Sequence, residues 1–208
     1  MTKAQSDKHM WTYNNCAVIV AHPDDETLWA GGLMLMHPNV KWTIITLCRK
    51  SDPDRAPRFF KALEKFKAAG IMADLDDGPE QKPLDSDLVQ QTIELILPSK
   101  SYDIIITHNT SGEYTRHLRH EETAQAVMEL WKADRLSAGQ LWTFAYEDGN
   151  RKYLPRAIED ADLLVGLNDE TWRKKYDIIT GIYGFDKESF EAKTTPKKEA
   201  FKCFKADH

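Results

Sequence analysis

The 208-residue chain is poor in features that mark several common classes of protein. Its three cysteines, Cys16, Cys48 and Cys203, lack Cys-x-x-Cys spacing, which argues against a disulfide framework and indicates reduced thiols. No apolar run approaches the roughly 18 residues that cross a bilayer, and the polar residues 1–15 lack the apolar stretch of a secretory signal. The 28 basic against 33 acidic residues give a net charge of -5, which disfavours nucleic-acid binding. We therefore expect a soluble cytoplasmic protein.

Motifs of several enzyme classes are also missing. The chain has no Gly-x-Gly-x-x-Gly after a strand, no P-loop and no Gly-x-Ser-x-Gly. The stretch from His120 to Ala124 begins His-Glu but lacks the second histidine of His-Glu-x-x-His. Dinucleotide binding, P-loop chemistry and a serine nucleophile are therefore disfavoured.

The residues that are present indicate a folded α/β protein. Six Trp, seven Tyr and eight Phe supply ample apolar surface for a core. Apolar runs at 16–21, 41–48, 103–108 and 140–146 predict strands. Helical spacing predicts helices at 27–36, 58 to Gly70, 85–97, 121–133 and 168–183. This alternation predicts one Rossmann-like domain over 16–208, after a polar segment 1–15, with a mainly parallel sheet and helices on both faces. We expect the lysine-rich 193–205 to be a solvated tail.

Side chains that bind metals cluster after two of the predicted strands. His22 to Glu26 follow the first strand, where Asp24, Asp25 and Glu26 are also ordinary helix-capping residues. His117 and His120 lie one helical turn apart, and His120 falls on the apolar stripe that must face the sheet. A packed or capping histidine is an equally good explanation for either one alone. Two inward histidines together with His22-x-x-Asp25 favour a metal site, because catalytic zinc takes three N or O ligands.

The same residues resemble the PIG-L (LmbE-like) family of zinc-dependent N-acetylglucosaminyl deacetylases. The resemblance rests on the Ala-His-Pro-Asp-Asp-Glu of 21–26 and the His-x-x-His of 117–120. Further similarity lies in 107–109, 112–114, Arg58 twelve residues before Gly70, and 198–201. The chain departs from the family where His-Leu-Arg-His replaces His-Pro-Asp-His, at Cys48 to Asp52, and at Lys61.

The resemblance implies a role for each matching residue. It implies zinc ligands at His22, Asp25 and His120, a general base at Asp24, and assistance to the tetrahedral intermediate by His117. It also implies substrate contacts by Arg58, Asn109 and Tyr114. Either Asp24 or His117 serves to return the proton to the departing amine.

The expected activity is removal of an acetyl group from an N-acetylglucosamine-type amide of a small sugar conjugate. The expected cofactor is Zn²⁺, with another divalent cation as an alternative. The sequence leaves two other functions open: the same metal centre acting on a non-sugar amide or acyl substrate, and a metal- or sugar-binding protein without turnover. It also leaves homo-oligomer formation open.

Overall fold

The structure is a computed structural model that describes residues 11–99 and 101–206. Its main sheet has seven strands in the order β3-β2-β1-β4-β5-β9-β8. The first five pair in parallel, whereas β9 pairs antiparallel with both β5 and β8. The predicted α/β class and mainly parallel sheet are therefore confirmed. The predicted polar segment falls largely outside the described residues, and Trp11 and Tyr13 at its end pack against the core.

The elements are bounded as follows. The strands of the main sheet are β1 (Asn15–Val20), β2 (Lys41–Cys48), β3 (Ala69–Leu75), β4 (Ser101–Thr107), β5 (Ser137–Phe144), β8 (Leu163–Gly166) and β9 (Lys198–Lys205). The short strands β6 (Tyr146–Glu147) and β7 (Arg156–Ala157) pair with each other. The helices are α1 (Asp25–Met36), α2 (Arg55–Phe66), α3 (Ser86–Ile96), α4 (Leu118–Lys132), α5 (Asp169–Asp177), the π-helical turn η1 (Ile178–Ile182) and α6 (Phe190–Thr194).

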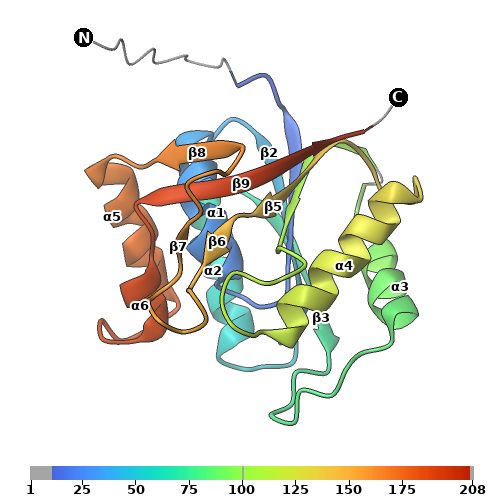
Figure 1. Ribbon diagram of the computed structural model, residues 1–208, viewed down its shortest axis with the longest axis horizontal. Helices are drawn as coiled ribbons and strands as arrows, with labels where there is room; N and C mark the ends of the chain where they lie inside the picture. Colours follow the sequence, from blue (N-terminus) through green and yellow to red (C-terminus); the bar gives the residue numbers. More distant parts are fainter. Residues whose placement is uncertain (1–10, 100, 207–208) are drawn as a thin grey trace.

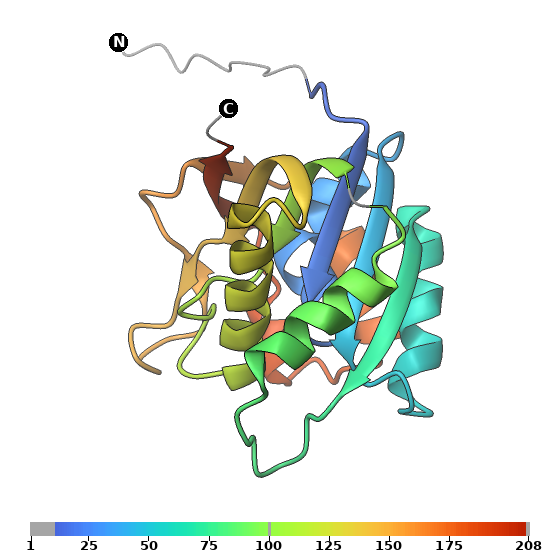
Figure 2. The same cartoon turned by 90° about the vertical axis from the view of Figure 1, so that its right-hand side faces the viewer.

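Helices cover both faces of the sheet (Figures 1 and 2). One apolar cluster joins the sheet to α1, α2 and η1, and the other joins it to α3 and α4. Successive residues of β1 alternate between the clusters: Val18 and Val20 enter the first, Ala17 and Ile19 the second. This is why β1 is an unbroken apolar run. Within the described part of the chain, no helix is long and apolar enough to span a membrane.

Two sequence expectations are wrong. Gly70 does not end a helix, because α2 stops at Phe66 with Lys67 left-handed (φ 54°) and Gly70 belongs to β3. The segment 193–205 is not a solvated tail, because its second half forms β9, with Glu199, Ala200 and Phe201 buried. Lys198, Lys202 and Lys205 make the sequence of this strand look like a solvated tail, although residues 199–201 are buried.

The cysteines are free thiols, as expected. Cys16 and Cys48 are buried in the sheet, and burial raises the pKa of each thiol to about 12. Neither is therefore a thiolate nucleophile near neutral pH.

Candidate metal centre and active site

The candidate site lies where the connectivity of the sheet changes direction. β1 pairs with β2 on one side and with β4 on the other, so the segments that leave β1 and β4 diverge at their carboxyl ends. Such a switch point opens a crevice in which α/β proteins bind ligands. The segment after β1 carries His22 to Glu26, and the segment after β4 carries His108 to His120.

Asp24 has an unusual backbone at the start of α1. Its φ is 115°, a region that residues other than glycine rarely adopt. The Glu26 carboxylate accepts the Asp24 N–H at 3.0 Å and is itself held by the Tyr183 hydroxyl at 2.7 Å. Glu26 is therefore a buried anchor for this turn. Strained backbone maintained by its surroundings is typical of functional sites.

The three proposed metal ligands lie together. Nδ1 of His22 lies 3.2 Å from Oδ2 of Asp25, and Nε2 of His120 lies 3.3 Å from the same oxygen. Ligand atoms at about 2.0–2.1 Å around a tetrahedral zinc are about 3.3–3.4 Å apart, so these spacings fit. Nε2 of His120 is buried without a hydrogen-bond partner, as expected of a nitrogen directed at a cation. The donor set therefore fits a divalent ion such as zinc.

Each histidine of this set has a carboxylate on its other nitrogen. Oδ1 of Asp77 lies 3.2 Å from Nε2 of His22, and Oε2 of Glu113 lies 2.7 Å from Nδ1 of His120. Such carboxylates orient metal-bound imidazoles. Burial alone would raise the pKa of Glu113, but His108 and His120 lower it to about 2, so it is ionised. Burial likewise opposes ionisation of Asp77, yet the His22 contact keeps its pKa below the ordinary value.

The roles of Asp77 and Glu113 were not predicted from the sequence. Asp77 follows β3, an edge strand whose Ala-Gly-Ile-Met-Ala-Asp-Leu sequence has no clear alternation. Recognition of that strand would have directed attention to its carboxyl end. Glu113 was seen only as a residue of the family-like stretch before His-x-x-His.

His108 is a fully buried neighbour of the site. Among the described residues, two groups could hold a metal ion: one consists of His22, His117 and His120, and the other of Asp25, His108 and His120. However, the Ala21 N–H donates to Nε2 of His108 at 3.0 Å, while Nδ1 of His108 faces Glu113 at 3.0 Å. Both ring nitrogens are thus occupied, so His108 is a buttress rather than a ligand.

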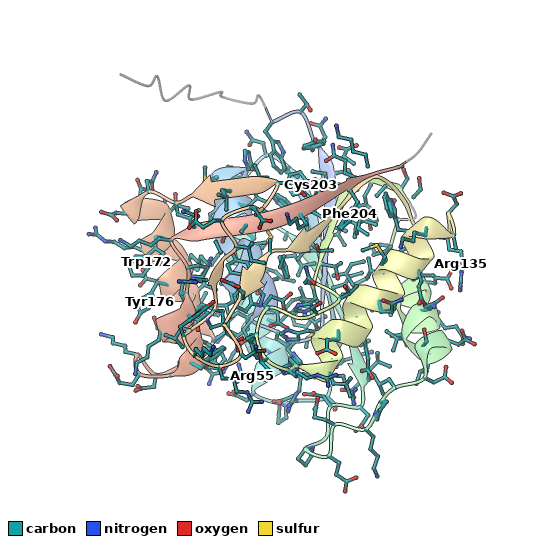
Figure 3. The ribbon with its side chains drawn as sticks, viewed as in Figure 1. Arg55, Arg135, Trp172, Tyr176, Cys203 and Phe204 are labelled. Atoms are coloured by element: carbon teal, nitrogen blue, oxygen red, sulfur yellow. The ribbon has the colours of Figure 1, made fainter. Side chains whose placement is uncertain are left out.

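The site opens into a polar pocket of about 250 Å³. Its lining comprises His22, Pro23, Asp24, Asp25, Arg49, Arg55, Asp77, Tyr114, His117, Phe185 and Glu191. The Arg55 guanidinium lies over the Phe185 ring, 4.4 Å from its centre, and its Nη1 is buried without a hydrogen-bond partner. Figure 3 shows Arg55 in the lower part of the molecule. Arg55 therefore offers an unused donor beside the pocket.

Of the three residues predicted to contact the substrate, the structure places one in the lining of the pocket and two outside it. Tyr114 lines the pocket. Arg58 is not among the lining residues, since its guanidinium donates to Asp54 and to the carbonyls of Ile182 and Tyr183. Asn109 is also outside the lining: its side chain bonds to Ser111 N–H and the Phe144 carbonyl. Arg49 lines the pocket but is paired with Asp77 at 2.6 Å.

Two pocket residues have opposite pKa shifts. Burial, and then the neighbouring Asp25 carboxylate, raise the pKa of Asp24 well above its ordinary value, while Arg55 opposes this. Burial, and then the imidazoles of His120 and His22, lower the pKa of His117 to about 3. The His117 ring is therefore neutral at physiological pH, and its buried Nδ1 has no hydrogen-bond partner.

Solved structures with the same fold include enzymes of two kinds. The N,N'-diacetylchitobiose deacetylase of Pyrococcus horikoshii matches with a TM-score of 0.69 at 12% identity, covering 93% of this chain and 85% of its own. The zinc-inhibited form of a teicoplanin deacetylase gives 0.67 at 12%, covering 93% and 99%. The 4-carboxy-2-hydroxymuconate hydratase of Pseudomonas putida gives 0.63 at 12%, covering 94% and 98%.

Sequence comparison is consistent with this fold. An uncharacterized protein of Acanthamoeba polyphaga mimivirus is 21% identical over 176 residues, which are 78% of this chain and 75% of that protein. The family model described as PIG-L, GlcNAc-PI de-N-acetylase, matches residues 17–131, more than half of the chain and the part that contains both histidine motifs. The chain thus belongs to the PIG-L family of de-N-acetylases and, with it, to the hydrolytic deacetylases.

Proposed function

We propose that the protein is a zinc-dependent hydrolase that removes the acetyl group from an N-acetylglucosamine-type amide of a small sugar conjugate. The observation that carries the proposal is the position of Asp24. It lines the polar pocket beside Asp25, the carboxylate shared by both histidine nitrogens, without itself being needed as a ligand. A carboxylate in that place can exchange protons with a water molecule next to the ligand set.

His22, Asp25 and His120 would hold the ion. When bound, zinc would polarise the amide carbonyl and lower the pKa of a coordinated water to about 7. Asp24 accepts a proton from the attacking water at its carboxylate and returns it to the amide nitrogen as the C–N bond breaks. The products are acetate and the free amine. The neutral His117 ring hydrogen-bonds the developing oxyanion.

The substrate would meet Arg55 rather than Arg58. Arg55 has a buried Nη1 without a partner and a guanidinium held over Phe185, whereas the donors of Arg58 are already used within the fold. Tyr114 forms another part of the pocket wall. We propose that Arg55 hydrogen-bonds an oxygen of the sugar conjugate.

Acetate release from N-acetylglucosamine conjugates by the zinc-loaded chain tests the proposal. We expect turnover by the wild type and a loss of at least 10²-fold in Asp24→Ala, because removal of a positioned base costs about 10²–10⁴-fold. Asp160→Ala is the matched control, since this carboxylate is 84% exposed and, within residues 11–99 and 101–206, forms an ion pair only with Lys202. Undiminished hydrolysis by Asp24→Ala would refute the assignment.

The alternative is the same metal centre acting on a non-sugar substrate. It is favoured by the hydratase that shares this fold and by the departures at 48–52 and 118–119. Screening sugar conjugates together with simple N-acetyl amines and carboxylated enols separates the two. Turnover confined to the non-sugar compounds would replace the sugar proposal, and zinc binding without any turnover would support a binding protein instead.

A further inference from the structure

The His-x-x-His motif contains a buried arginine, Arg119. The side chain of Arg119 is 1% exposed, although it lies in the first turn of α4, directly before His120. A guanidinium is buried only when its donors find acceptors, because an unpaired buried charge is costly. Its contacts therefore indicate what this position does.

Arg119 holds the segment that connects β3 with α3. Its Nε donates to the Asp76 carbonyl at 2.6 Å and its Nη2 to the Lys82 carbonyl at 2.8 Å. Its Nη1 meets Oε2 of Glu122, whose other oxygen accepts the Leu84 N–H at 2.8 Å. The first turn of α4 thus forms hydrogen bonds with both ends of the loop 76–84. This loop projects at the bottom of Figure 1.

The loop that Arg119 holds in place carries Asp77, whose carboxylate faces His22. Asp77 lies beside Asp76, and its Oδ1 is 3.2 Å from Nε2 of His22. The Gln81 side chain donates to the same oxygen at 2.9 Å. The Asp77 Oδ2 accepts from Arg49 Nε at 2.8 Å. One continuous set of contacts therefore leads from Arg119 through the loop to a metal ligand.

We propose that Arg119 is a positioning residue for the metal centre, which fixes Asp77 against His22 and so sets the orientation of that ligand. The inference rests on the metal site of the proposed function. Arg119 is adjacent in sequence to His120, so one short motif supplies one histidine ligand and orients the other. A planar fork is required, because two carbonyls from different parts of the loop must be reached from one buried position.

Zinc affinity of the full-length chain, stripped of metal and titrated against a chromophoric chelator, tests the inference. We expect Arg119→Gln and Asp77→Ala each to weaken zinc binding about 10- to 100-fold, the usual effect of losing a partner of a ligand. In the Asp77→Ala background, adding Arg119→Gln should change the affinity by less than about 2-fold, because the route through Asp77 is already lost. If the losses of zinc affinity in the two single variants multiply in the double variant, Arg119 does not act through Asp77.

Arg135→Gln is the matched control for a purely structural loss. Arg135 also ties two elements together, through Glu94 at 2.5 Å and Gln90 at 2.8 Å, but Figure 3 places it at the opposite end of α4 from the motif. It should lower thermal stability and leave zinc affinity unchanged. If Arg119→Gln does the same, the positioning role is wrong.

Two further results separate the possible failures. If Arg119→Gln does not fold, Arg119→Lys keeps the buried charge but not the two-carbonyl fork, and the inference requires weaker zinc binding in this variant too. If the wild type binds no zinc, the proposed function fails and the inference falls with it. Normal binding by the wild type and by Arg119→Lys overturns the inference alone.

Discussion

Around the pocket, burial and hydrogen bonding distinguish ligands from buttresses. His108 and His120 stack with ring centres 3.9 Å apart and share Glu113, so composition and proximity do not separate them. The two imidazoles differ in the partner of Nε2. Nε2 of His108 accepts the Ala21 N–H, whereas Nε2 of His120 has no hydrogen-bond partner. A single backbone hydrogen bond therefore decides which imidazole is free for an ion.

This difference predicts opposite outcomes for two histidine substitutions. His120→Ala should lose bound zinc, because one of three protein ligands is removed. His108→Gln should keep stoichiometric zinc while lowering the melting temperature. Metal content after gel filtration, measured by mass spectrometry, checks both. Loss of zinc from both variants would favour the group of Asp25, His108 and His120, and retention of zinc by His120→Ala would contradict any site that uses His120.

The two arginines of α2 are predicted to act differently. Arg55→Ala should lower kcat/KM roughly 10- to 100-fold at unchanged zinc content, since a hydrogen bond to a charged group contributes about 1.5–3 kcal/mol. Arg58→Ala should mainly lower stability, because its donors serve Asp54 and the carbonyls of Ile182 and Tyr183. Kinetics and melting curves on both variants test this. An exchange of the two phenotypes would restore Arg58 as the substrate residue.

At the scale of elements, a buried ion pair joins three parts of the chain. Lys175 of α5 donates to Glu199 of β9 at 2.6 Å, and both side chains are fully buried. The same carboxylate accepts the N–H groups of Gly32 and Leu33 in α1, each at 2.7 Å. Gly32 also lets Leu167 pack closely against α1, because a Cβ on Gly32 would lie 2.4 Å from the Leu167 side chain.

Lys175→Met is therefore predicted to destabilise the fold strongly. Removing one partner of a buried pair leaves an uncompensated charge and costs about 3–5 kcal/mol. Urea unfolding measures the effect. Lys174→Met is the control, because this neighbouring lysine forms an exposed pair with Glu170 and should leave the unfolding midpoint unchanged. Equal midpoints for the two variants would contradict a structural role for the buried pair.

At the scale of the whole molecule, the core and the metal centre are separate. The two apolar clusters fill both faces of the sheet, whereas the ligands lie at the carboxyl ends of β1 and β4. The buried carboxylates there have hydrogen-bonding partners within the protein, as Glu113 and Asp77 illustrate. The fold should therefore persist without metal.

Zinc removal is predicted to lower stability without unfolding the chain. At a zinc concentration 100 times the dissociation constant, binding to the folded state adds about 2.7 kcal/mol to the free energy of unfolding. Melting curves with zinc and with a chelator should differ accordingly, while the far-UV circular dichroism at 25 °C stays the same. Loss of that signal on chelation would show that the metal is required for folding.

Prediction from sequence worked best where the pattern was strong. β1, β2 and β4 were placed to within two residues, because a strand buried on both faces is an unbroken apolar run. The edge strand β3 and the lysine-rich β9 were missed, since each is partly exposed and has a sequence of mixed polarity. Because β3 was not predicted, Asp77 was not recognised as a residue at the carboxyl end of a strand.

The sequence by itself determined the fold class and the ligand-type residues, because alternating apolar periods and compact motifs such as residues 21–26 are local properties. Only the tertiary structure decided which nitrogens are free, that Arg55 rather than Arg58 borders the pocket, and that Arg119 grips the loop of Asp77. These outcomes depend on contacts between residues distant in the chain. Burial and the nearest hydrogen-bonding partner, not residue type, determine what each such side chain can do.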